Sequence, residues 1–232
     1  DAWGDYWSGG QAGRLLAVVF LGALAFNMQD VLLEPYGGEV LGLPVAATTM
    51  LTFAWASGAL LGFGLAARWL TAGQDHFRLA ARGILIGIAA FAAVVFAGPL
   101  GSPPLFFAGA AMIGLGAGLF AVSTLTAAMA MPTRGVAGGG LALGAWGAAQ
   151  ATGAGLATAL GGAIRDVVHQ TAMAGHLGEG LMTPDIGYSV VSRLEIGLLF
   201  LTLATLGPLV RSRPLTTTEP QHRGIGLADF PT

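Results

Sequence analysis

The chain has 232 residues and a formal net charge of −2, and 54% of its residues are hydrophobic while 9% are charged. This composition, with long uncharged apolar runs, indicates an all-α polytopic membrane protein. The charge balance excludes a basic nucleic-acid-binding surface, and the absence of cysteine and lysine excludes disulfides, thiolate metal sites and Schiff-base chemistry.

The chain divides into a linker, a helical bundle and a tail. Residues 1–13 are rich in glycine and aromatic side chains, and we expect them to lie at the membrane interface. About six transmembrane helices follow within residues 14–210, each with the ~20 residues that a hydrocarbon core of ~30 Å requires. The predicted helices cover residues 14–33, 45–69, 79–97, 105–130, 136–164 and 190–210. Residues 211–232 are predicted to form a cytoplasmic tail.

The first predicted helix ends in a cluster of polar side chains. The cluster consists of Asn27, Gln29, Asp30 and Glu34. Polar groups are costly at membrane depth, so the cluster needs a partner, a cavity or a ligand. Helical spacing predicts that Asn27, Asp30 and Glu34 share one face. The sequence from Pro35 to Gly38 is expected to stop the helix.

Residues 27–38, with the sequence NMQDVLLEPYGG, followed by the pattern TTxLT at 48–52, closely resemble the PucC/LhaA family of phototrophic bacteria. The resemblance implies a major-facilitator-like membrane protein that helps to assemble light-harvesting antenna complexes. It extends to about Val210 but matches only the second half of a family member. It therefore implies a C-terminal half-bundle, with the first half missing from this sequence.

If the resemblance extends to pigment binding, the intramembrane polar residues are candidate ligands for (bacterio)chlorophyll. A pigment magnesium accepts one hard axial oxygen or nitrogen atom. The candidates are Asn27, Gln29, Asp30, Glu34 and, in the fifth span, Gln150. An ordinary interhelical hydrogen bond is the alternative role for each. Glu195, in the sixth span, lies two residues from Arg193, which indicates interfacial pairing or snorkelling rather than a pathway.

Small residues predict how the helices pack. Because lipid provides no hydrophobic drive for association, transmembrane helices approach through glycine faces. Three Gly-x-x-x-Gly pairs are expected to pack within the chain rather than to form a dimer: Gly58 and Gly62, Gly114 and Gly118, and Gly140 and Gly144.

Two connections carry most of the polar residues. The segment 68–82 is predicted to be a loop whose Arg68, Arg78 and Arg82 either dock a cytoplasmic partner or form a solvated connector. The segment 165–188 is predicted to be a polar outer loop that serves as a contact surface. Its His169 and His176 are too few for a convincing metal site, so no metal is predicted.

Arginine placement predicts the orientation of the bundle. Arg165 and Arg193 lie on one side, and the other eight arginines lie opposite: Arg14, Arg68, Arg78, Arg82, Arg134, Arg211, Arg213 and Arg223. The positive-inside rule makes the side with eight arginines cytoplasmic. Both ends of the bundle are then expected on the cytoplasmic face of the bacterial inner, photosynthetic membrane.

Three functions are compatible with these observations. The resemblance implies an assembly factor for light-harvesting and reaction-centre complexes, with antenna polypeptides, the reaction centre and membrane lipid as partners. It would bind or deliver bacteriochlorophyll or chlorophyll. A secondary transporter of a small amphipathic solute is the alternative, with residues 27–34 as its midplane site. An enzyme of pigment synthesis ranks last, because the sequence offers no nucleophile pair or phosphate-binding acidic motif, and we expect no enzymatic activity.

Overall fold

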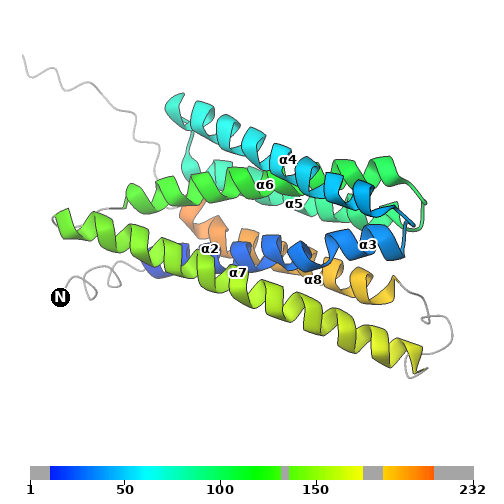
Figure 1. Cartoon of the computed structure of the whole chain (residues 1–232). Helices are drawn as coiled ribbons and strands as arrows, with labels where there is room; N and C mark the ends of the chain where they lie inside the picture. Colours follow the sequence, from blue (N-terminus) through cyan, green and yellow to red (C-terminus); the bar gives the residue numbers. More distant parts are fainter. Residues whose placement is uncertain (1–10, 132–135, 175–184, 212–232) are drawn as a thin grey trace, which may run out of the picture.

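The computed structural model describes residues 11–131, 136–174 and 185–211. Every regular element in these ranges is a helix, which confirms the predicted all-α class. In chain order the elements are α2 (Gln11–Asn27), the 3-10 helix η1 (Met28–Val31), α3 (Leu33–Glu39), α4 (Val45–Thr71), α5 (His76–Ala97), α6 (Pro103–Met129), α7 (Val136–Met173) and α8 (Ile186–Arg211). The long helices run alternately in opposite directions along one axis (Figure 1). Most of the predicted linker and tail, residues 1–10 and 212–232, lies outside the described residues.

Five helical segments of the described chain are long and apolar enough to cross a membrane, and each overlaps a predicted span. They are Gln11–Glu39, Val45–Thr71, His76–Ala97, Pro103–Met129 and Ile186–Arg211. The remaining predicted span corresponds to α7, which has 38 residues. This helix is long enough to cross a membrane, but it is less apolar than the other five segments. The chain is therefore a multi-pass membrane protein by the length and composition of its helices.

The predicted outer loop at 165–188 is wrong at both ends. α7 continues to Met173, and residues 165–173 contain no proline that would stop it. α8 begins at Ile186, so residues 186–188 are helical as well. His176 and the other residues from 175 to 184 lie outside the described residues.

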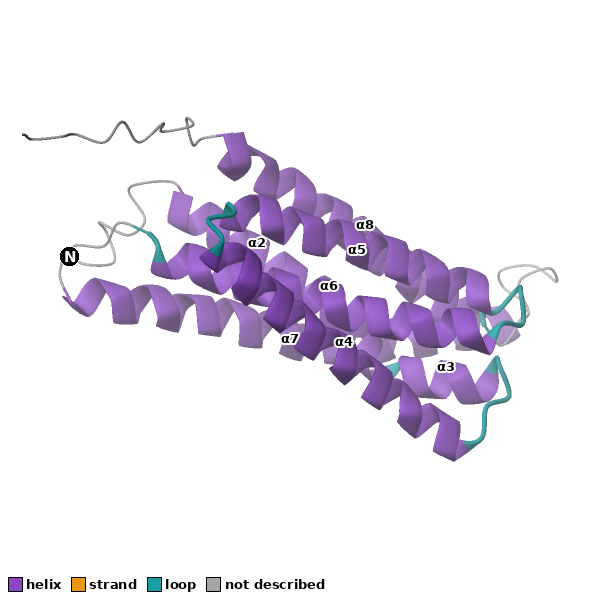
Figure 2. Cartoon of the chain, turned by 90° about the horizontal axis from the view of Figure 1, so that it is seen from above, coloured by secondary structure: helices purple, strands orange, loops and turns teal. Residues whose placement is uncertain are grey.

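The helices form two layers of three. α6 packs between α4 and α5 in one layer, and α2 packs between α7 and α8 in the other. Contacts between α5 and α8 join the layers along one edge, and Figure 2 shows these two helices side by side. At the opposite edge α4 and α7 make little direct contact. We call this second edge the open edge.

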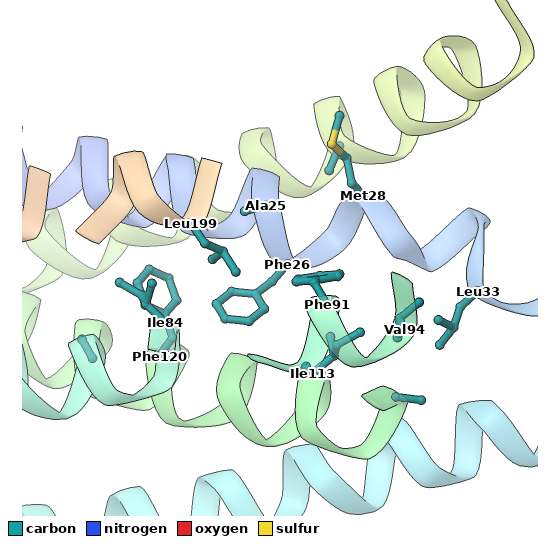
Figure 3. Packing of buried hydrophobic residues seen from close by; sticks show 14 of the residues in the cluster. Ala25, Phe26, Met28, Leu33, Ile84, Phe91, Val94, Ile113, Phe120 and Leu199 are labelled. Carbon is teal, nitrogen blue, oxygen red and sulfur yellow. The ribbon is translucent and has the colours of Figure 1, made fainter. Parts of the chain in front are cut away.

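Aromatic side chains fill the space between the layers. The ring centroid of Phe26 in α2 lies 6.4 Å from that of Phe91 in α5 and 5.8 Å from that of Phe120 in α6. All three rings are buried, and Figure 3 shows Phe26 between the other two. The three rings therefore form a row between the two layers, which we call the aromatic wall.

Glycine allows α4 and α6 to approach closely. A Cβ atom on Gly114 would overlap the carbonyl oxygen of Trp55, and one on Gly58 would overlap the backbone of α6. This confirms the predicted packing of the first two glycine pairs within the chain. The third pair behaves differently, because no atom of the described chain lies within 4 Å of a Cβ added to Gly140 or Gly144. The prediction that this pair packs within the chain was wrong for the part that the structure describes.

Candidate functional site

A break in the first span decides where its polar residues point. The 3-10 turn Met28–Val31 separates α2 from α3. Pro35 explains the break, because it has no N–H to donate to the carbonyl of Val31 and its ring would crowd that carbonyl. Pro35 itself lies in the first turn of α3, where a missing N–H is tolerated. The predicted stop at Pro35 to Gly38 was therefore wrong, since α3 continues to Glu39.

One cavity lies at the open edge, between α2, α4, α6 and α7. It has a volume of about 160 Å³ and brings together two of the predicted candidates, Asn27 of α2 and Gln150 of α7. Its walls are otherwise mainly apolar and include Phe26, Phe63 and Phe120. We call it the open-edge cavity. The chain thus places two amide side chains from distant segments around one space.

Three polar side chains of the open-edge cavity have different hydrogen-bonding states. The Asn27 Nδ2 donates to the carbonyl oxygen of Ala23 at 2.6 Å. In contrast, Gln150 Oε1 and Trp55 Nε1 are buried atoms without a hydrogen-bond partner among the described residues. Buried polar atoms are normally paired, so these two atoms are exceptions. The residues around the cavity thus offer one unpaired acceptor, on Gln150, and one unpaired donor, on Trp55. Sequence reasoning missed Trp55, although an indole N–H within an apolar span signals a need for a partner.

A second cavity, lined by Phe91 of the aromatic wall, lies between η1, α3, α5, α6 and α8. It has a volume of about 20 Å³, enough for one water-sized species, and we call it the inner cavity. Gln29 and Glu195 line it, and their side chains are only 5% and 1% exposed. The Oε1 atom of each has no hydrogen-bond partner in the described part of the chain.

The predicted interfacial pairing of Glu195 with Arg193 was wrong. Residues two positions apart on a helix point in nearly opposite directions, so Glu195 enters the core while Arg193 remains exposed. The sequence distance between the two residues was a misleading signal.

The other two candidates of the polar cluster lie at the surface. Asp30 is exposed and accepts a hydrogen bond from Gln29 Nε2 at 2.9 Å. Glu34 is also exposed and accepts from Thr52 Oγ1 of α4 at 2.7 Å. Neither residue lines the open-edge cavity or the inner cavity. The five predicted pigment ligands therefore do not form a single site.

A polar network ties α3, α7 and α8 together at the end of the bundle where α7 finishes. Arg165 Nη2 lies 2.6 Å from Glu39 Oε2, and Arg165 Nη1 lies 2.9 Å from Asp166 Oδ1. The Tyr188 hydroxyl donates to Glu39 Oε2 at 2.7 Å and accepts from Arg165 Nη2 at 2.7 Å. Tyr188 also lines the inner cavity, so the network reaches from the surface to that space.

The predicted docking arginines lie on helix ends rather than in a long loop. Arg68 is in the last turn of α4, and Arg78 and Arg82 are in the first turns of α5. All three are exposed, and Arg82 Nη1 donates to Gln74 Oε1 at 2.6 Å. The connection is short because Asp75 caps α5, accepting a hydrogen bond from the Arg78 backbone N–H at 2.9 Å. The three guanidinium groups therefore belong to one end of the bundle.

Comparisons with known proteins relate the chain to PucC proteins. A family model described as PUCC protein matches residues 1–214. An "Uncharacterized protein in puhA-bchM intergenic region" of Rhodobacter capsulatus is 57% identical over 234 residues, which cover 100% of this chain and 48% of that protein. "Protein PucC" of Rhodovulum sulfidophilum is 52% identical over 168 residues, covering 72% of this chain and 37% of that protein.

A further relative is the "Bacteriochlorophyll synthase 44.5 kDa chain" of Rhodobacter capsulatus, which is 34% identical over 170 residues, covering 71% of this chain and 39% of the relative. The chain thus spans about half, or less, of the length of these curated relatives. No solved structure matches the chain.

Proposed function

The chain belongs to the PUCC protein family, and on this basis we propose that it acts in the assembly of light-harvesting and reaction-centre complexes. Names of its relatives support a role linked to photosynthesis, since they include PucC proteins and a bacteriochlorophyll synthase chain. The proposed role is not enzymatic, and its partners are antenna polypeptides, the reaction centre and membrane lipid. The proposed location is the photosynthetic inner membrane, with both ends of the bundle cytoplasmic.

The open-edge cavity is the proposed place for part of a (bacterio)chlorophyll. Gln150 suits the pigment because its buried Oε1 is an unpartnered hard acceptor, the kind of ligand that magnesium takes. Trp55 suits it as well, because its free indole N–H fits a carbonyl group on the pigment. When bound, the pigment would supply a magnesium ion that Gln150 could hold through its Oε1 atom. Asn27 would border the same space.

The size of the cavity limits how the pigment is held. Pockets that enclose a small molecule usually have roughly 300–1,000 Å³, and the open-edge cavity has about 160 Å³. Only one side of the macrocycle would therefore enter, while the rest would extend along the open edge between α4 and α7. A partly exposed pigment suits lateral transfer to a single-span antenna helix better than permanent storage.

Pigment retention tests this assignment. The whole protein would be captured from phototrophic membranes in mild detergent, and pigment per protein measured by absorption and mass spectrometry. Gln150→Leu removes the free acceptor at similar volume and should lower the pigment content several-fold. Glu34→Gln is the matched control, because Glu34 lies at the surface outside the cavity, and it should retain pigment. Equal pigment in the parent and Gln150→Leu would refute Gln150 as the ligand.

The three exposed arginines are the proposed docking site for a cytoplasmic partner segment. Arg68, Arg78 and Arg82 present positive charge at one end of the bundle. Replacing all three by glutamine should reduce recovery of antenna polypeptides, and added salt should reduce recovery by the parent. Recovery that responds to neither change would mean that the arginines serve only membrane orientation.

Secondary transport of a small amphipathic solute remains the second candidate. The observation that favours it is the pair of buried Oε1 atoms of Gln29 and Glu195, which have no hydrogen-bond partner among the described residues, since polar and ionisable groups at membrane depth often mark transport paths. A protein that purifies without pigment or photosynthetic polypeptides, and that moves such a solute into vesicles, would favour this role.

A further inference from the structure

The inner cavity brings together two acceptor atoms that have no hydrogen-bond partner, although the hydroxyls of Ser192, Tyr36 and Tyr188 also line it. Glu195 Oε1 and Gln29 Oε1 are both buried, both unpartnered among the described residues, and both on side chains that line the same space. A carboxylate oxygen and an amide oxygen only accept hydrogen bonds, so they cannot satisfy each other. A species with a positive charge or a donor, placed between the two Oε1 atoms, would satisfy both.

The surroundings of the inner cavity provide no cation. Its lining consists of Gln29, Leu32, Leu33 and Tyr36 from the η1–α3 segment, Phe91 and Val94 from α5, Ile113 from α6, and Tyr188, Ser192 and Glu195 from α8. The titratable neighbours are the two tyrosines, together with Asp30, which binds the amide of Gln29. None of these groups is a base that becomes positively charged. An uncompensated carboxylate at membrane depth is unfavourable, so Glu195 needs a counter-charge that the described residues lining the cavity do not supply.

We propose that Glu195 and Gln29 form a buried binding site for one monovalent cation, either an exchangeable proton on Glu195 or a sodium ion between the two Oε1 atoms. The volume of about 20 Å³ suits one species of this size. The single carboxylate balances a single positive charge. A divalent metal ion is less suitable, because no group of three or more His, Asp or Glu side chains gathers in the described part of the chain.

Polar side chains connect this cation site to the surface on two sides. On one side, Gln29 Nε2 donates to the exposed Asp30 at 2.9 Å. On the other side, Tyr188 lines the cavity and binds Glu39 at 2.7 Å, within the network that includes Arg165. The site is therefore buried but lies next to two hydrogen-bonded routes. It does not depend on the proposed pigment, which belongs to the other cavity.

Two measurements on the purified whole protein in detergent test the proposal. The first is an infrared difference spectrum between acidic and alkaline buffer, where a protonated carboxyl group has its own C=O band. The second is thermal stability in sodium chloride compared with choline chloride at equal ionic strength. Glu195→Gln removes the charge while keeping the shape, and Gln29→Leu keeps the carboxyl but removes its partner oxygen. Asp75→Asn is the control, because Asn caps a helix as well as Asp does.

The two sources of charge give different results. A proton site predicts a carboxyl band that titrates in the parent and in Asp75→Asn, disappears in Glu195→Gln and shifts its midpoint in Gln29→Leu, without a sodium effect. A sodium site predicts sodium-specific stabilisation that Glu195→Gln abolishes and Gln29→Leu weakens. A parent with neither response, or with responses that Glu195→Gln leaves unchanged, would overturn the proposal.

Discussion

The contact between α4 and α6 offers a sharp test of how this bundle is held together. A Cβ atom on Gly114 would overlap the carbonyl oxygen of Trp55 and would lie 2.9 Å from the backbone nitrogen of Ala59. Both obstacles are backbone atoms, so no side chain can rotate away to make room. Gly114→Ala must therefore separate the two helices or shift one along the other.

The expected cost of Gly114→Ala follows from this geometry. Inserting a group into a well-packed contact destabilises a protein by about 1–3 kcal/mol. Alanine favours a helix over glycine by roughly 1 kcal/mol, which offsets part of this loss. We expect a net loss of about 0–2 kcal/mol relative to the parent, and of about 1–3 kcal/mol relative to a glycine-to-alanine change that meets no obstacle. Trp55 must move with the backbone, so the open-edge cavity should change as well.

Thermal stability in detergent, followed by the loss of the monodisperse peak in size-exclusion chromatography, measures this effect. Gly144→Ala is the matched control, because no atom of the described chain lies within 4 Å of its added Cβ and only the helix preference changes. The control should match or exceed the parent in stability. If Gly114→Ala is as stable as Gly144→Ala, the close approach of α4 and α6 is not a source of stability.

Three further predictions concern helix ends and the break. Asp75→Ala removes the cap of α5 and should lower stability by about 1 kcal/mol in thermal unfolding, whereas Asp75→Asn should not. Arg165→Gln breaks a partly exposed ion pair with Glu39 and should cost about 1 kcal/mol or less, a difference that added salt should reduce. Pro35→Ala restores a donor for the Val31 carbonyl, so the break should straighten. Thermal stability should then rise, while pigment retention should fall. If thermal stability and pigment retention rose together or fell together, this reasoning would be wrong.

The helical bundle was predictable because its signals are local. Each apolar run is long enough to span a membrane, and the glycine pairs of α4 and α6 mark a contact that the structure confirms. The glycine pair of α7 has the same spacing but no neighbour within reach of an added Cβ. A glycine pattern identifies a surface that permits close approach, while the fold decides whether another helix occupies it.

The candidate sites were predictable only as a list of residue types. Asn27 and Gln150 were identified as polar residues at membrane depth, but their shared cavity depends on how α2 and α7 pack. Glu195 was assigned to the interface because it lies two residues from Arg193. Its burial instead depends on the direction in which each side chain leaves α8, which is nearly opposite for these two residues. Trp55 was not selected, since its free N–H becomes apparent only when its surroundings are known.

The break at η1 explains why one polar cluster serves two separate spaces. In an uninterrupted helix, Asn27 and Gln29 would differ in direction by about 200° around the axis, and the 3-10 turn changes this spacing locally. Phe26 precedes both residues and lines the open-edge cavity, whereas Phe91, its neighbour in the aromatic wall, lines the inner cavity. Any movement of this turn would act on both cavities together. If the cation site and the pigment site are both occupied as proposed, binding in one should change affinity in the other by the same factor in each direction.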